Sequence, residues 1–302
     1  MIVSFSAQAA TVDKFAEKAT HKLIGKVKKV ESYYGSNTWG DNLIFSRVSV
    51  KVEKKLKGEM FDNVEFTVEG GTVGDMTLNV SECPLFSEGE VFLFYLKKTD
   101  GKFEYLYSQE PGETIDAVRP GKSSPAKIPL LCCNTFAKWP NANVYYYINP
   151  NTSDVSPDCA INDIISGAAA WNDCSGINLS YSGKTPTHVI SSTDGNVIFF
   201  RPDSSGNTIA VTYTWYARKG GQIIAFDMVF YDGAWKFFSE TCPTNCSIGF
   251  YIQTIATHEL GHAIGLDHNK CGSSMMYPYA SYCTINGLSA DDVACARNLY
   301  GY

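Results

Sequence analysis

The most constraining feature of this chain is a short segment with histidine, glutamate and glycine at fixed spacings, namely His258-Glu259-Leu260-Gly261-His262-Ala263-Ile264-Gly265-Leu266-Asp267-His268. Residues four apart lie one turn above each other on an α-helix, so His258 and His262 point the same way and can share a metal ion. His268 becomes a third ligand if the chain leaves the helix and doubles back. Gly265 tolerates the left-handed conformation that such a turn needs. The segment therefore predicts a helix, a sharp turn and a metal site.

The chemistry of this residue set indicates zinc. Zinc in a hydrolytic site takes three protein ligands and keeps a fourth position for water, whose pKa the metal lowers towards neutrality. Glu259 lies beside the ligands and is a candidate general base for that water. The alternative is an ordinary amphipathic helix with surface histidines. However, only His21 and His188 lie outside this segment, so three of the five histidines fall where the geometry requires them.

These spacings resemble the signature of the metzincin metallopeptidases, HExxHxxGxxH followed by a methionine-containing turn. The sequence Ser274-Met275-Met276-Tyr277-Pro278 is similar to the Met-Tyr-Pro turn of the matrixin branch, peptidase family M10. By this resemblance Met276 forms an apolar floor under the zinc histidines, with Tyr277 and Pro278 supporting it. Asn269 argues against the astacin branch, which carries glutamate after the third histidine. The stretch Leu288 to Gly301 also looks like the last matrixin helix.

Two departures from the matrixin pattern affect specificity and metal content. The chain reads Pro278-Tyr279-Ala280 where matrixins usually have proline, any residue and tyrosine lining the primed-side pocket, which leaves the pocket shape open. The stretch from Asn196 to Phe238 contains no histidine, so we expect no second, structural zinc.

Calcium is a separate question. The candidate oxygen ligands are four loop aspartates, which more often form turns and caps: Asp194, Asp203, Asp227 and Asp232.

The resemblance implies a mechanism and a mode of substrate binding. Zinc carries the attacking water and polarises the scissile carbonyl of an internal peptide bond, and Glu259 accepts the proton and passes it to the leaving amine. In the family an extended substrate pairs with the edge strand of the sheet by main-chain hydrogen bonds. We place that edge near Thr208–Trp215. The expected partner is therefore a protein or peptide substrate.

Composition excludes some other classes. The chain has 302 residues and a net charge of -6, with both signs mixed and no basic tail, so nucleic-acid binding has no support. The longest apolar runs, such as Val91–Leu96, have strand length, and no membrane-spanning helix is expected.

Ten cysteines in a chain with a hydrolase signature indicate disulfides formed in an oxidising compartment. The start resembles the end of a secretory signal with cleavage after Ala9, although no charged n-region precedes it; a disordered N-terminus is the alternative. We therefore expect a secreted, extracellular or periplasmic protein.

Spacing does not settle the disulfide pairing. Cys159 and Cys174 would lie about 22 Å apart along one continuous helix, so they cannot pair with each other. The candidate pairs are Cys271 with Cys283 around the methionine turn, and Cys242 with Cys246 across a small loop.

The N-terminal part reads as a β domain. Val48, Val50 and Val52 alternate with polar residues, and Asp100-Gly101 is a hairpin signal between two apolar runs. About five strands suggest a small closed barrel, preceded by a helix over Thr11 to Thr20.

The same region is similar to the netrin-like barrels related to the OB-fold, which occur in tissue inhibitors of metalloproteinases and fused to some bacterial peptidases. The matching pieces are Ile24-Gly25-Lys26-Val27, Leu56-Lys57-Gly58 and Gly89-Glu90 before Val91–Tyr95. The inhibitors chelate zinc through an N-terminal cysteine. No cysteine precedes Cys83 here, so that mechanism is not carried over. The barrel either regulates the peptidase or simply packs on it, and we expect contact between the two.

The expected organisation has two domains: a signal-like segment at 1–10, a β-barrel at 11–118, a Pro- and Ser-rich linker at 119–138 and an α+β metzincin domain with a mixed twisted sheet at 139–302. We expect the elements of the last domain at Val144–Ile148, Asp158–Trp171, Val197–Phe200, Ile209–Trp215, Ile223–Phe230 and Ile252 to Ala263. Matrixin proenzymes are blocked by a propeptide cysteine on the zinc. Cys132 or Cys133 is a candidate for that role, against the alternative of disulfide pairing.

The sequence thus predicts a secreted zinc metalloendopeptidase. Two alternatives stay open: a secreted binding or adhesion protein whose peptidase half is secondary, and a zymogen autoinhibited by its first domain.

Overall fold

The computed structural model describes residues 15–111, 132–203, 208–242 and 245–302. The chain forms two compact units, and each is made of separate pieces of sequence. The first unit comprises Met1–Tyr34, Ile44–Val73 and Cys83–Pro129, and the second comprises Gly35–Leu43, Gly74–Glu82 and Leu130–Tyr302. Two short segments from the N-terminal half of the chain therefore belong to the second unit. The signal-like residues 1–10 and most of the expected linker lie outside the described residues.

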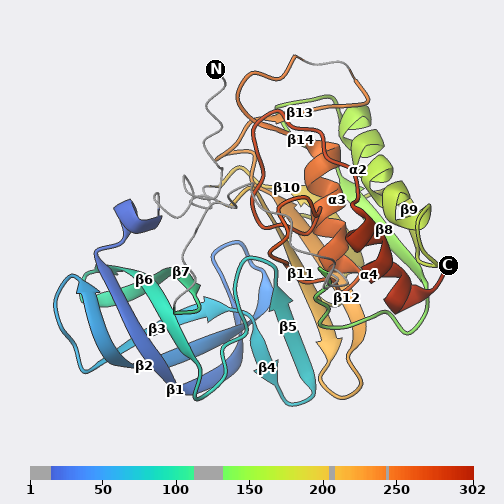
Figure 1. Ribbon diagram of the computed structural model, residues 1–302. Coiled ribbons are helices and arrows are strands. Elements are labelled where there is room, and N and C mark those ends of the chain that lie inside the picture. Colours follow the sequence, from blue (N-terminus) through green and yellow to red (C-terminus); the bar gives the residue numbers. More distant parts are fainter. Residues whose placement is uncertain (1–14, 112–131, 204–207, 243–244) are drawn as a thin grey trace, which may run out of the picture. The chain divides into compact units, whose positions relative to one another are not determined.

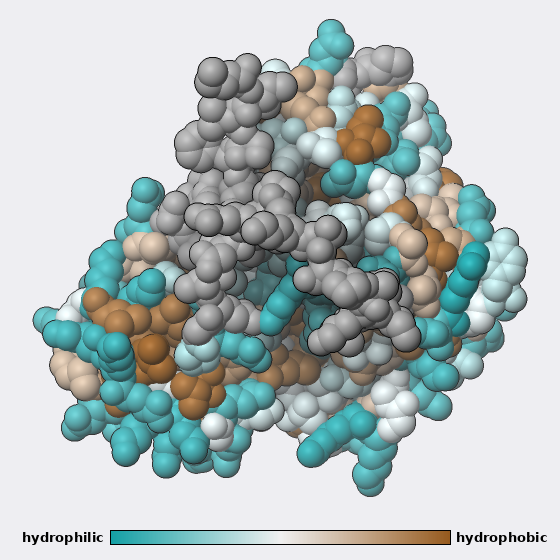
Figure 2. Space-filling view, in the orientation of Figure 1, coloured by the Kyte–Doolittle hydropathy of each residue, from teal (hydrophilic) through white to brown (hydrophobic). Residues whose placement is uncertain are grey.

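The first unit is an antiparallel sheet whose strands follow the order β3-β2-β1-β6-β7. The strands are β1 (His21–Ser36), β2 (Asn42–Lys57), β3 (Asn63–Glu69), β6 (Val91–Thr99) and β7 (Lys102–Gln109). The predicted alternation on β2 is confirmed, because Val48, Val50 and Val52 are buried in the core of the unit. Figure 2 shows hydrophilic residues over much of the visible surface, with a hydrophobic area over this sheet.

The predicted hairpin between β6 and β7 is also confirmed. Thr99 pairs with Lys102 across the turn, and both turn residues have positive φ, 51° for Asp100 and 79° for Gly101. Two positive φ values in a two-residue loop match the right-handed twist of the flanking strands. Of the expected first helix, residues 15–18 are helical.

The expected closure of this sheet is not seen among the described strands. The pairings run from β3 at one end of the order to β7 at the other, and no described ladder joins these two. Their side chains nevertheless share one core, where the ring of Phe66 on β3 stacks on that of Tyr105 on β7 with centroids 5.5 Å apart.

The second unit contains a mixed sheet in the order β4-β5-β11-β12-β10-β8-β9 (Figure 1). Its strands are β4 (Gly71–Val73), β5 (Met76–Val80), β8 (Asn143–Asn149), β9 (Asn178–Lys184), β10 (Asn196–Phe200), β11 (Ala210–Ala217) and β12 (Gln222–Phe230). Strands β9, β8, β10 and β12 are parallel, whereas β11 runs antiparallel to β12, and β5 runs antiparallel to β11. The expected mixed sheet is present, with strands close to the predicted ranges.

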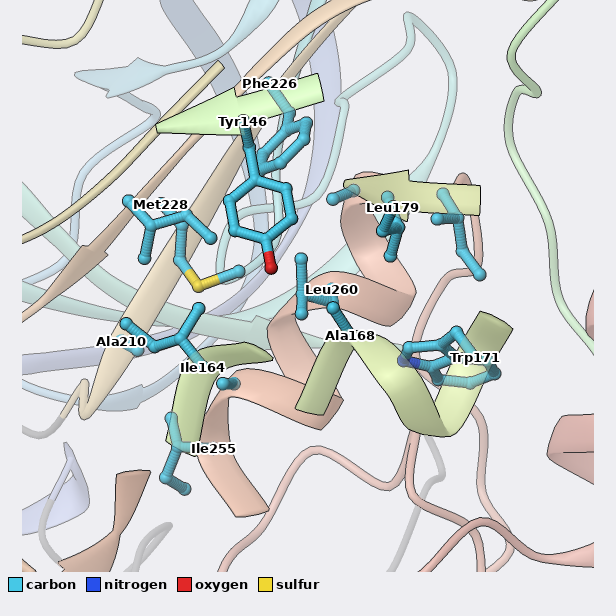
Figure 3. Close-up of a cluster of buried hydrophobic side chains, with 14 of the residues drawn as sticks. Tyr146, Ile164, Ala168, Trp171, Leu179, Ala210, Phe226, Met228, Ile255 and Leu260 are labelled. Carbon is cyan, nitrogen blue, oxygen red and sulfur yellow. The ribbon is translucent and has the colours of Figure 1, made fainter. Parts of the chain in front are cut away.

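Two helices pack together on this sheet. They are α2 (Pro157–Asn172) and α3 (Ile252–Ala263), and Figure 3 shows their side chains in one core with Tyr146, Phe226 and Met228 of the sheet. Helix α2 begins one residue before the predicted range, with Ser156 accepting a hydrogen bond from the Cys159 amide and Pro157 in the first turn. The remaining elements are β13 (Phe237–Phe238), β14 (Phe250–Tyr251) and α4 (Ala290–Tyr300).

Four disulfides connect parts of the second unit: Cys132–Cys271, Cys133–Cys295, Cys159–Cys242 and Cys246–Cys283. Both suggested pairs, Cys271 with Cys283 and Cys242 with Cys246, are therefore wrong. The two cysteines of each of these four pairs are 37 to 162 residues apart, so folding rather than local spacing brings them together. Cys132 and Cys133 are both disulfide-bonded, which removes them as zinc-blocking thiolates.

A buried ion pair fixes the first of the two N-terminal segments in the second unit. Asp41 is fully buried and its carboxylate accepts two hydrogen bonds of 2.9 Å from Arg201, whose side chain is 4% exposed. The Ile190 amide donates to the same carboxylate at 2.8 Å. The guanidinium also lies 5.0 Å from the ring centre of Trp39. Sequence reasoning missed this pair, because its members are 160 residues apart.

Removing one partner of this ion pair should be costly. We expect Arg201→Met to lower the free energy of unfolding by about 3–5 kcal/mol, because it leaves the Asp41 charge buried without a counterion. The double variant Arg201→Met/Asp41→Asn should recover part of that loss, since no uncompensated charge remains. Urea unfolding of both variants measures the difference, and equal stabilities would contradict this account.

Candidate metal centre

Three imidazole nitrogens converge at the C-terminal end of α3. The Nε2 atoms of His258, His262 and His268 lie 3.1–3.2 Å from one another. His258 and His262 come from successive turns of the helix, and His268 comes from the loop that follows. No other group of three described histidine, cysteine or carboxylate side chains has three ligand atoms this close, apart from one that contains the disulfide Cys132–Cys271.

The hydrogen bonds of the rings leave the converging nitrogens ready to bind a cation. The Nδ1 of His258 lies 2.6 Å from the Met275 carbonyl, and the Nδ1 of His262 lies 2.8 Å from the Leu266 carbonyl. A carbonyl only accepts hydrogen bonds, so each Nδ1 carries the proton and each Nε2 has a free lone pair. Burial, reinforced by the neighbouring imidazoles, holds the pKa of His262 and His268 well below the usual range.

The size of this triangle fits zinc. Tetrahedral zinc with Zn–N bonds of about 2.0–2.1 Å places its nitrogen ligands about 3.3 Å apart. The three lone pairs would repel one another without a cation among them. The residues present therefore fit one zinc ion held by three histidines.

The chain reversal after α3 depends on Gly265. Its φ is 95°, in the left-handed region, and a Cβ at this position would lie 2.0 Å from the carbonyl oxygen of Ala137. The Gly265 amide donates to the carbonyl of His262, and the Leu266 amide donates to that of Gly261. These bonds close the helix and turn the chain so that His268 faces the two helical histidines.

The methionine turn lies directly beneath the helix. Met276 is 1% exposed, and a Cβ on Gly261 would lie only 2.3 Å from its sulfur atom. The Met276 carbonyl accepts a hydrogen bond from the Asn269 amide. Tyr277 and Pro278 follow as half-buried residues at the end of the turn. The sequence analysis did not identify Gly261 as a functional residue. Its position between His258 and His262 was the available signal, because a side chain that packs under the helix needs space there.

Asp292 is a second residue that sequence reasoning missed. Its buried carboxylate accepts hydrogen bonds from the Met275 amide at 2.7 Å and the Ser274 hydroxyl at 2.5 Å. It also accepts from the Ser289 amide in a capping box at the start of α4. One carboxylate therefore joins the methionine turn to the last helix. The spacing Ser289-x-x-Asp292 was a visible signal for the cap, but not for the contact with the turn.

Glu259 is buried beside the histidines. Its Oε2 accepts a hydrogen bond from the Thr212 hydroxyl of β11 at 2.7 Å and from the Ser81 hydroxyl at 3.3 Å. Burial raises the pKa of this carboxyl, while the neighbouring His258 ring and the hydrogen bonds from the two hydroxyls act in the opposite direction.

A second carboxylate, Glu82, points towards the same place. Its Oε1 lies 3.9 Å from the Nε2 of His268. Desolvation and the Glu259 charge raise the pKa of Glu82 to about 8, although 36% of its side chain remains exposed. Glu82 lies far ahead of α3 (Ile252–Ala263) in the sequence, and no local pattern identified it.

The four candidate calcium ligands differ in their surroundings. Asp227 is buried, and its two oxygens accept hydrogen bonds from the Ser191 and Val197 amides. Asp194 accepts one from the Thr193 hydroxyl. In contrast, the Oδ1 atoms of Asp203 and Asp232 are buried with no hydrogen-bond partner among the described residues.

Comparison with known proteins identifies the family of this chain. The family model for matrixins matches residues 138–301, more than half of the chain. The chain belongs to the matrixin family. Membership implies one catalytic zinc, and the His258, His262 and His268 group is where the structure can hold it. No described helix of this matrixin is long and apolar enough to cross a membrane.

Individual relatives agree with this assignment. Karilysin from Tannerella forsythia is 31% identical over 169 residues, which is 55% of this chain and 34% of that protein. Stromelysin-1 from Equus caballus is 28% identical over 171 residues, 54% of this chain and 33% of its own length. Matrix metalloproteinase-20 from Homo sapiens is 28% identical over 242 residues, 77% of this chain and 45% of its own length. The chain thus spans less than half the length of these relatives.

The close approach of Met276 to α3 gives a test of the floor. We expect Gly261→Ala to lower the free energy of unfolding by about 1–3 kcal/mol, because the new methyl group overlaps the Met276 sulfur. Zinc retention after dialysis should fall with it. Gly287→Ala is the matched control, since a Cβ there meets no atom within 4 Å. Equal stability and zinc content in the two variants would mean that Met276 does not constrain the helix.

Proposed function

We propose that this matrixin is a zinc-dependent metalloendopeptidase that hydrolyses internal peptide bonds. The observation that carries the proposal is the triangle of Nε2 atoms with a buried glutamate adjoining it on the same helix. His258, His262 and His268 are the proposed zinc ligands, and Glu259 is the proposed general base. Bound zinc supplies a Lewis acid for the scissile carbonyl and lowers the pKa of a water molecule.

Residues of the chain then transfer the proton of this water molecule. Glu259 accepts it from the water and delivers it to the leaving amine. Thr212 orients the Glu259 carboxylate through its 2.7 Å hydrogen bond. The backbone carbonyls of Met275 and Leu266 orient two of the imidazoles and keep their Nε2 atoms unprotonated. Gly265 and Met276 maintain the positions of the ligands without touching the substrate.

Substitutions separate the roles of these residues. We expect Glu259→Gln to lower the turnover of casein by roughly 10²–10⁴-fold while one zinc stays bound, because the proton acceptor is lost and the ligands are not. His258→Ala, His262→Ala and His268→Ala should instead lower the zinc content. The exposed residues Glu53 and His188 provide the controls Glu53→Gln and His188→Ala. Full activity in Glu259→Gln would show that another group is the base.

The disulfides support a proposed location. Four disulfides in one unit are stable in an oxidising compartment and rare in a reduced cytosol. We therefore propose that the protein acts outside the cytosol, in the extracellular space or the periplasm.

For the first unit we propose a netrin-like or OB-type barrel. Its five antiparallel strands and the stacking of Phe66 on Tyr105, which lie on the two ends of the strand order, support a sheet that curls around one core.

We further propose that Asp203 and Asp232 bind calcium. Each has a buried carboxylate oxygen without a hydrogen-bond partner among the described residues, and a buried unpaired carboxylate is costly. Burial raises the pKa of both carboxyls, and the Asp232 charge contributes to the increase at Asp203. Calcium prefers such oxygen ligands.

Calcium binding would appear as a change in thermal stability. At a concentration a hundred times its Kd, calcium should raise the Tm on the order of 5 °C, because it binds only the folded state. Asp232→Asn should abolish this increase, whereas Asp194→Asn should keep it. The measurement is differential scanning calorimetry with calcium and with a calcium chelator that leaves zinc bound. An unchanged Tm in the wild type would refute the site.

A further inference from the structure

The third histidine lies outside α3 and needs a support of its own. His258 and His262 belong to the helix, whose backbone hydrogen bonds fix them relative to each other. His268 belongs to residues 265–271, which we call the ligand loop. Its side chain is 21% exposed, whereas His262 is fully buried. Metal affinity depends on how firmly every ligand is held, so the contacts of this loop matter for the zinc.

A segment before β8 pairs with the ligand loop. This segment, residues 132–138, is called the strap below. The Asp267 amide donates to the Asn134 carbonyl at 2.8 Å, and Thr135 forms an antiparallel bridge with Leu266. The strap is therefore a short partner for the backbone of the ligand loop.

Further contacts hold the backbone at and just after His268. The side-chain amide of Asn134 donates to the His268 carbonyl at 2.8 Å. The next residue, Asn269, is 6% exposed, and its side-chain amide donates to the Cys132 carbonyl at 3.2 Å. The disulfide Cys132–Cys271 then joins the strap covalently to the end of the loop.

The strap is also anchored to the helices of the second unit. Cys133 is bonded to Cys295 of α4. Directly after the strap, the Trp139 indole donates to the Ala263 carbonyl at the end of α3 at 2.9 Å, and the Trp139 amide donates to the Tyr300 hydroxyl at 3.0 Å. The strap thus connects the loop that carries the third histidine to the helix that carries the other two.

Most of the strap lies ahead of the range that the matrixin family model matches. That range begins at residue 138, so both strap cysteines and Asn134 precede it. Each of the two strap disulfides joins a cysteine ahead of the matched range to one inside it. These contacts with the ligand loop are therefore made by residues that the family model does not cover.

We propose that the strap positions the third zinc ligand, with Asn134 and the Cys132–Cys271 disulfide as its positioning groups. The inference rests on the proposed function, because it concerns the same zinc. Both groups act through the backbone of the ligand loop and touch neither the zinc ligand atoms nor a substrate. Their loss should lower zinc affinity, because residues that orient the ligands of a metal typically change its affinity by about 10–100-fold.

The first test removes the strap disulfide from the full chain. Cys132→Ser/Cys271→Ser is compared with Cys159→Ser/Cys242→Ser, which removes another disulfide of the same unit. The paired cysteines are 139 and 83 residues apart, and the entropic effect on the unfolded chain depends only on the logarithm of loop length. The two variants should therefore lose similar stability. We expect the Kd for zinc, measured by competition with a chromophoric chelator, to rise about 10–100-fold in the first and to stay unchanged in the second.

The second test removes one hydrogen bond and leaves every disulfide in place. Asn134→Ala loses the donor to the His268 carbonyl and keeps its own carbonyl, which accepts from Asp267. Thr135→Ala is the matched control, because Thr135 is exposed and pairs with the loop through its backbone. Asn134 is itself exposed, so we expect the smaller effect here, a rise in the Kd for zinc on the order of tenfold or less.

The visible absorption spectrum of the cobalt form is the second measurement, because it reports the geometry of the ligands and needs no turnover. It should change in Asn134→Ala and in Cys132→Ser/Cys271→Ser. Both control variants should match the wild type. A role confined to general stability would lower the Tm of the zinc-free protein without changing this spectrum.

Other outcomes separate this inference from the proposed function. Wild-type zinc affinity and cobalt spectra in both strap variants would refute the positioning role and leave the peptidase function intact. An equal loss of zinc affinity in the two disulfide variants would also refute it. A loss confined to Cys132→Ser/Cys271→Ser would refute the role of Asn134 and support that of the disulfide. Weaker zinc binding in the strap variants, with no casein cleavage even by the wild type, would support the strap and refute the peptidase function.

Discussion

Three imidazole nitrogens that face one another within 3.2 Å are an arrangement that a protein must hold against repulsion until a cation joins them. In this matrixin, elements that are distant in sequence together hold the three imidazoles in place. A buried helix presents His258 and His262, and a left-handed glycine returns the chain so that His268 meets them. The methionine turn supports the helix from below. Asp292 attaches that turn to α4, and two disulfides, Cys132–Cys271 and Cys133–Cys295, connect the segment before β8 to the same region.

The sheet also contributes to the proposed catalytic site. Strand β11 supplies Thr212 to the proposed general base, and its outer edge is where an extended substrate is expected to pair. An exposed edge strand is also a liability, because its unpaired amides and carbonyls bind other strands indiscriminately. Strand β5 satisfies that edge and ends at the metal site.

Much of the second unit was predictable from local patterns. The apolar runs gave β8, β10, β11 and β12 nearly to the residue, and the capping serine and proline marked the start of α2. The active-site helix was predicted at its observed bounds, Ile252–Ala263. These predictions succeeded because periodicity and capping act over a few residues. The predicted disulfides failed for the opposite reason: three of the four actual pairs join cysteines more than 80 residues apart.

The sequence by itself determined the proposed ligand set, the helix that carries two of these histidines and the glycine turn that brings in the third, because all three are encoded within eleven residues. Only the tertiary structure decided which residues surround that set. Strand pairing with β11 brings the Ser81 hydroxyl to Glu259 and the Glu82 carboxylate within 3.9 Å of His268, and Asp41 reaches Arg201 from a separate segment. Strand pairing and ion pairing between distant residues depend on the positions of whole elements, and no local pattern records those positions.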